Sequence, residues 1–118
     1  MRELTFDSFS EANLKRCEHP AGFNHQLNSW STSDWMTATM GELGEAANIV
    51  KKLNRFRDEI PGNGTITVME LRTALADEIA DTFIYLDLLA QSLGMDMANI
   101  VMSKFHRTSL KIGYMHKV

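Results

Sequence analysis

Proline is scarce in this chain, and its placement limits what the chain can fold into. Only Pro20 and Pro61 occur, and each lies in a stretch that also contains glycine or asparagine, as is typical of breaks between helices. Between the breaks, apolar residues recur at helical intervals over long proline-free segments. No segment alternates apolar and polar residues as a half-buried strand does. The sequence therefore predicts an all-α fold.

Four helices are expected, and polar side chains suited to capping mark where three of them begin. Ser33 and Asp96 are placed to cap the second and fourth helices, and Thr67 with Glu70 forms a capping-box pattern ahead of the third. No linker is long enough to separate domains, so residues 1–118 are expected to form one domain with a core of the four-helix-bundle type. The helices are expected at about residues 5–18, 33–57, 67–94 and 96–111.

The third predicted helix is apolar on nearly all sides over its second half. A helix of this kind is usually buried all round, and three neighbours in a short chain offer limited cover. We therefore expect a homo-oligomer that shares this helix. The alternative is a central helix that is fully covered within a monomer. The residues concerned are Ile79, Phe83, Ile84, Leu86, Leu88, Leu89, Ala90 and Leu93.

Charge and cysteine content exclude several classes of function. The chain has 12 basic and 15 acidic residues and a net charge of -3, which disfavours binding to nucleic acid or to an anionic membrane. Cys17 is the only cysteine, so no intrachain disulfide forms and no zinc-binding spacing exists. No apolar run approaches the roughly 18 residues of a membrane span, and residues 1–10 do not resemble a signal peptide. A cytoplasmic location is expected.

Two pairs of carboxylates stand out on consecutive predicted helices. Glu42 and Glu45 are three residues apart on one helix, and Glu78 and Asp81 have the same spacing on the next. Residues at this spacing share a helix face. If the two pairs face each other, a divalent cation would relieve their mutual repulsion. Oxygen ligands alone suit hard ions such as magnesium, manganese or calcium and argue against zinc.

Other interpretations of the four carboxylates remain open at this stage. They can be solvated, or they can pair with Lys51, Lys52 and Arg72. A di-iron bundle also uses inward carboxylates, but it normally needs Glu-x-x-His at two places, and neither Glu45 nor Asp81 is replaced by histidine here.

A helical wheel places possible substrate contacts near the carboxylates. Trp35 and Lys52 share the face of the first pair, with Asn48 at its edge, and Tyr85 falls beside the second pair. Trp35 is a candidate to stack on a base and Lys52 to meet a phosphate oxygen, although a helical aromatic is more often part of the core. Trp30 lies in a segment without clear periodicity and receives no such placement.

These motifs resemble those of the MazG-like all-α nucleoside triphosphate pyrophosphohydrolases. The family signature, Glu-x-x-Glu followed on the next helix by Glu-x-x-Asp, stands here as E-L-G-E at 42–45 and E-I-A-D at 78–81. The flanking phrases from Trp35, from Ala76 and from Val101 (V-M-S-K-F) are also similar to family members. The resemblance extends over about residues 30–111.

The resemblance implies a specific enzyme. Glu42, Glu45, Glu78 and Asp81 would coordinate magnesium on a triphosphate, and water would release a nucleoside monophosphate and pyrophosphate. Glu42 and Glu45 would be the catalytic pair, with Glu45 the candidate base. The resemblance further implies dimers or dimers of dimers. It places substrate contacts at Trp35, Asn48, Lys52, Tyr85 and Lys104.

The chain departs from the family pattern in two places. Many relatives have a double glutamate at the start of the first motif, where Gly41 stands here, and the 32 residues between Glu45 and Glu78 exceed the commoner spacing. The expected function is nucleotide-pool cleaning. The alternatives are a phosphoribosyl-ATP pyrophosphatase and a helical module that binds a nucleotide or a partner without catalysis.

Overall fold

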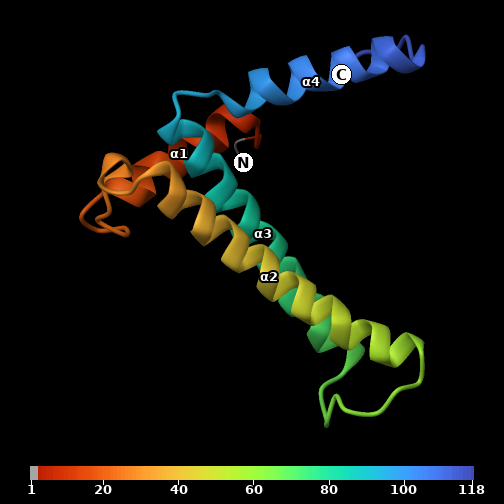
Figure 1. Ribbon diagram of the computed structural model, residues 1–118. Helices are drawn as coiled ribbons and strands as arrows, with labels where there is room; N and C mark the ends of the chain where they lie inside the picture. The colour runs from red at the N-terminus through yellow and green to blue at the C-terminus, as the bar shows by residue number, and fades with distance from the viewer. Residues whose placement is uncertain (1–2) are drawn as a thin grey trace. The chain divides into compact units, whose positions relative to one another are not determined.

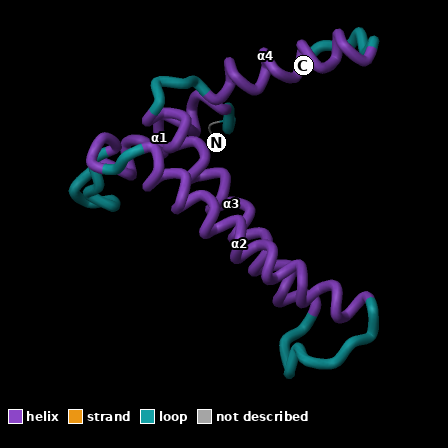
Figure 2. Tube along the Cα trace, in the orientation of Figure 1, coloured by secondary structure: helices purple, strands orange, loops and turns teal. Residues whose placement is uncertain are grey.

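A computed structural model describes residues 3–118, and over this range the chain is helical without any strand (Figures 1 and 2). The predicted all-α class is confirmed at this level. A single 3-10 turn, η1, follows the first helix. It lies in a segment whose apolar residues show no clear period. The elements are α1 (Phe6–Glu18), η1 (Leu27–Ser29), α2 (Thr32–Arg57), α3 (Val68–Ser92) and α4 (Met97–Ile112).

The start of α2 corrects one expectation. Ser33 was expected to cap this helix, but α2 begins at Thr32 and Ser33 lies inside its first turn. The carbonyl of Ser33 accepts a hydrogen bond of 2.9 Å from Thr37 Oγ1, four residues further along the helix. Helix starts are easily misplaced by one residue where several hydroxyl side chains adjoin, because each is able to accept from the first free N–H groups.

The predicted caps of α3 and α4 are confirmed. Thr67 Oγ1 accepts from the backbone N–H of Glu70 at 3.1 Å, and Glu70 Oε1 accepts from the backbone N–H of Thr67 at 3.2 Å, which completes a capping box. Asp96 Oδ2 accepts from the N–H of Asn99 at 3.0 Å and caps α4. Gly94, just after α3, has a φ of +69°, a left-handed conformation that glycine adopts without steric cost.

The chain divides into two compact units, one formed by residues 33–86 and the other by residues up to 32 together with 87–118. The first unit consists of α2 and most of α3, which run side by side and are joined by residues 58–67 (Figure 1). Trp35 and Ala46 of α2 and Leu71 of α3 are buried. Asn63 holds the connection by donating to the carbonyl of Lys52 at 2.8 Å.

The second unit packs α1, η1, the end of α3 and α4. Its core includes Cys17, Leu88, Leu89 and Met97, all buried. The Cys17 thiol donates to the carbonyl of His25 at 3.2 Å, and burial raises the pKa of this thiol above its ordinary value. Cys17 is therefore a small core residue, as is common for a free cysteine.

The apolar residues of α3 differ widely in burial. Leu88, Leu89 and Ala90 are buried, whereas Ile79, Leu86 and Leu93 are exposed. None of the helices within residues 3–118 combines the length and the apolar character needed to cross a bilayer.

Candidate metal centre

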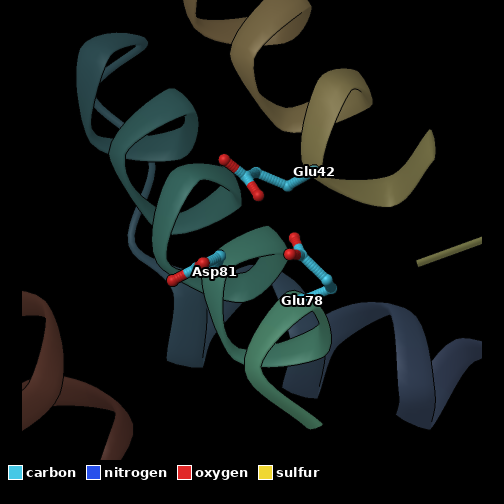
Figure 3. A group of neighbouring side chains, drawn as sticks. All are labelled: Glu42, Glu78 and Asp81. Carbon is cyan, nitrogen blue, oxygen red and sulfur yellow. The ribbon is translucent and has the colours of Figure 1, made fainter. Parts of the chain in front are cut away.

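The four predicted carboxylates lie within the unit formed by residues 33–86. Helical geometry places Glu42 and Glu45 one turn apart on α2, and Glu78 and Asp81 one turn apart on α3. Because α2 and α3 run side by side, the two pairs come together, and Figure 3 shows the carboxylates of Glu42 and Glu78 pointing toward each other. The spacing in the sequence thus translates directly into one acidic cluster.

Three of these side chains are close enough to share one ion. Glu42, Glu78 and Asp81 each offer a carboxylate oxygen, and these oxygens all lie within 4.8 Å of one another. Glu42 and Glu78 are half-buried and Asp81 is exposed. One oxygen of this cluster, Glu78 Oε2, is enclosed and accepts no hydrogen bond from the described part of the chain. An enclosed carboxylate oxygen without a donor is unfavourable unless a cation or water reaches it.

Glu45 is exposed and lies beside this group of three. Its contact with Glu78, together with the negative charge of that neighbour, raises the pKa of the Glu45 carboxyl above its ordinary value. The pKa of Glu78 is raised as well, mainly through its contact with Glu42 and then through desolvation. Like charges at short range disfavour ionisation, so the carboxyl groups of Glu45 and Glu78 hold their protons more tightly than isolated ones do.

The donor set fits a hard divalent cation. Within residues 3–118, none of the four carboxylates forms an ion pair with Lys51, Lys52 or Arg72, the basic residues that the sequence offered as partners. The group consists of carboxylate oxygens alone, which suits magnesium, manganese or calcium better than zinc. One bound ion would reduce the repulsion among these carboxylates and give the unpaired oxygen of Glu78 a partner. The oxygens of Glu42, Glu78 and Asp81 are close enough together to bind it.

The residues predicted to contact substrate are placed differently from one another. Asn48 is exposed and Lys52 half-buried on α2, and Lys104 is exposed on α4 in the other unit. Trp35 is 1% exposed, and its ring lies 6.3 Å from that of Tyr85 at 46°. The indole of Trp35 is therefore packed in the interior and offers no open face to a base, while Tyr85 is half-buried beside it.

Two features of interest lay outside what the sequence indicated. The unpaired oxygen of Glu78 depends on side-chain packing, for which the sequence gives no direct signal. Trp30 is 36% exposed and lines a groove next to η1. Its segment has no periodic pattern, and the only sequence signal was a large aromatic residue among polar neighbours.

Comparison of the chain with protein-family models, with curated proteins and with solved structures gave no match. The resemblance to the MazG-like enzymes thus rests on the motifs at 42–45 and 78–81 and their flanking phrases.

Proposed function

We propose that this chain is a magnesium-dependent nucleoside triphosphate pyrophosphohydrolase that converts a ribo- or deoxyribonucleoside triphosphate and water into the monophosphate and pyrophosphate. The observation that carries the proposal is the convergence of Glu42, Glu78 and Asp81, whose oxygens lie within 4.8 Å of one another. The motif resemblance supports the same reaction. Removal of noncanonical or surplus triphosphates from the cytoplasmic nucleotide pool is the role that fits it.

The residues of the cluster divide into two tasks. Glu42, Glu78 and Asp81 would hold the ion, and manganese would suit the same oxygen ligands. When bound, the ion neutralises the triphosphate, polarises a phosphoryl group and lowers the pKa of a bound water. Glu45 lies exposed beside Glu78, and in this proposal its carboxylate would accept a proton from an attacking water. A reaction of this type requires no covalent nucleophile.

Positive charge for the phosphates would come from a small number of side chains. Lys52 lies on α2, the helix that carries Glu42 and Glu45, and we assign it a phosphate contact, with Asn48 as a polar contact one turn before it. Lys104 is exposed on α4, and the resemblance to the MazG-like enzymes suggests a phosphate contact for it as well. Tyr85 remains a candidate for a sugar contact through its hydroxyl.

The proposed enzyme is a homodimer or homotetramer with a four-helix core. Large apolar side chains are exposed along both helices of the unit formed by residues 33–86, although such side chains are usually covered. A second copy of this pair of helices would bury them and complete a four-helix arrangement. The exposed residues include Met36, Met40, Leu43, Val50, Ile79 and Leu86.

The decisive experiment measures pyrophosphate release from a panel of standard and modified ribo- and deoxyribonucleoside triphosphates, with magnesium and with chelator. Glu45→Gln and Asp81→Asn are expected to lose turnover by at least about 100-fold, because each removes a group that acts on the metal or the water. Asp77→Asn is the matched control, since Asp77 is an exposed acid of α3 that is not part of the cluster.

The alternatives give different results in the same assay. Release from phosphoribosyl-ATP but from no other substrate would identify a phosphoribosyl-ATP pyrophosphatase. Nucleotide binding without any release would identify a binding module. Full activity of Glu45→Gln or Asp81→Asn would overturn the assignment of these residues.

A further inference from the structure

A groove of about 460 Å³ lies in the unit that contains α1 and α4, away from the four carboxylates in sequence. It is bordered by the end of α1, by η1 with the residues that follow it, and by the last residue of α3. This volume is within the range of small-ligand sites, which span roughly 300 to 1,000 Å³. Its lining residues are Glu18, Gln26, Leu27, Asn28, Trp30, Ser31, Thr32 and Ser92.

Trp30 is the aromatic residue of this groove. The chain has two tryptophans, and their exposure differs: 36% of the surface of Trp30 is exposed, against 1% for Trp35. The imidazole of His25 packs edge-on against the indole, with ring centroids 4.5 Å apart and an interplanar angle of 72°. Trp30 is therefore an exposed aromatic whose orientation is supported by a neighbouring ring.

Polar side chains surround the indole, and local hydrogen bonds position two of them. Glu18 Oε2 accepts from the backbone N–H of Leu27 at 3.0 Å, and the carbonyl of Glu18 accepts from Gln26 Nε2 at 3.2 Å. Asn28 adds an exposed amide within η1, and it makes no hydrogen bond with the described residues through that side chain. The groove thus presents amide donors and acceptors beside an aromatic surface.

The charge of the lining narrows the class of ligand. No lysine or arginine lines the groove, and its one charged residue is Glu18. A phosphate or carboxylate group would meet a negative side chain and no cation there. The groove therefore suits an uncharged planar molecule that stacks on an indole and exchanges hydrogen bonds with amides.

We propose that the Trp30 groove binds a nucleobase, which stacks on the indole while its polar edge meets the amides of Gln26 and Asn28. The choice of a nucleobase among planar heterocycles rests on the proposed function, because a nucleotide is the ligand class inferred for this chain. Any base can stack on an aromatic side chain, because every base has a π-face. Amides distinguish one base from another by hydrogen bonds to the polar edge of the base.

The test uses nucleosides, which carry no phosphate, in the presence of chelator. The full chain is labelled with ¹⁵N at the indole nitrogen of tryptophan, which gives two resonances, one from Trp30 and one from Trp35. Adenosine, cytidine, uridine and their deoxy forms are titrated to about 10 mM, a range that reveals affinities as weak as millimolar. A saturable shift of the Trp30 resonance, with Trp35 unmoved, is the expected result.

Matched variants distinguish the contribution of the Trp30 ring to nucleoside binding from that of the amide side chains. Trp30→Leu should weaken nucleoside affinity roughly 5- to 150-fold, the loss that corresponds to one base–aromatic stack. Binding to this variant is followed from the nucleoside resonances, while the Trp35 signal reports that the fold is retained. Asn28→Leu should change the order of preference among bases, and Asn99→Leu, an exposed amide on α4 that does not line the groove, should not.

Three results would overturn the proposal. They are the lack of any saturable Trp30 shift, equal shifts of both tryptophans, and the same shift with ribose alone. Since the titration contains neither metal nor phosphate, its outcome is independent of the pyrophosphate assay. Nucleoside binding without triphosphate hydrolysis would support the Trp30 groove and overturn the proposed function. Hydrolysis without nucleoside binding would support the proposed function and overturn the Trp30 groove.

Discussion

Asn13 Nδ2 donates a hydrogen bond of 2.9 Å to Asp87 Oδ2, although 74 residues separate them in the chain. Asp87 has no exposed surface, and its carboxylate also accepts from Ser10 Oγ at 2.5 Å and from Gln91 Nε2 at 2.9 Å. A buried carboxylate is tolerated where several donors satisfy it. This network joins α1 to the end of α3 and specifies how the two helices pair.

Loss of one donor from this network should destabilise the fold. Asn13→Ala leaves Asp87 buried and one hydrogen bond short, so we expect the free energy of unfolding to fall by about 1–3 kcal/mol. Urea denaturation followed by circular dichroism measures this change. Asn99→Ala, at an exposed position on α4, is the control and should change stability by less than about 0.5 kcal/mol. Equal losses in both variants would show that the network has no special role.

Much of the fold was predictable because local signals dominate it. Capping side chains, helical periodicity and two proline-containing breaks are short-range features, and they located four helices to within a few residues. Asp87 illustrates the limit of such signals, because its partners at Ser10 and Asn13 lie on a distant helix. No short-range feature of the sequence around Asp87 indicates these partners, and only tertiary packing shows that the residue is buried.

The candidate site was predictable to a similar extent. The Glu-x-x-Glu and Glu-x-x-Asp spacings placed each pair on one helix face, and the convergence of Glu42, Glu78 and Asp81 agrees with that pattern. The same helical wheel placed Trp35 on the face of Glu42, where the structure buries its ring. A wheel gives direction around a helix but not the depth of a side chain, and neighbouring side chains determine how far the ring is covered.

Magnesium should stabilise the protein through the carboxylate cluster. A ligand that binds only the folded state adds about 2.7 kcal/mol at a concentration 100 times its dissociation constant. We expect magnesium to raise the thermal unfolding midpoint of the wild type. Magnesium should hardly change the midpoint of Glu78→Gln, because this variant lacks the negatively charged carboxylate whose enclosed Oε2 would bind the ion. Differential scanning fluorimetry with magnesium and with chelator measures the shift. Asp77→Asn should respond as the wild type does, and a full response of Glu78→Gln would exclude this residue as a ligand.

Acid should stabilise the metal-free protein through the same carboxylates. The pKa values of Glu45 and Glu78 in the folded state are raised above the ordinary 4.5, so the folded chain holds their protons more tightly than the unfolded chain does. Their contribution to stability is then fully present below pH 4.5 and is lost as the pH rises through the raised folded values.

The measurement is the free energy of unfolding in chelator as the pH rises from 4.5, the ordinary carboxyl value, because the raised groups lose their protons above it. Replacing both Glu45 and Glu78 by glutamine should make the free energy of unfolding decline less as the pH increases. Asp77→Asn serves as the control and should keep the whole decline. A profile that is unchanged in the double variant would show that repulsion within the cluster does not affect folding.

Leu86 and Leu88 provide a matched pair that separates packing within one chain from contact between copies. Leu88 is 4% exposed, so Leu88→Asp buries an unpaired charge and should unfold the protein. Leu86 is 40% exposed, so Leu86→Asp should keep the helical content and lower the sedimentation coefficient, if a second copy covers this face as proposed. Thr73→Asp, at an exposed position on α3, controls for the added charge. Sedimentation velocity and far-ultraviolet circular dichroism distinguish these outcomes, and an unchanged sedimentation profile of folded Leu86→Asp would show that Leu86 is not at an interface between copies.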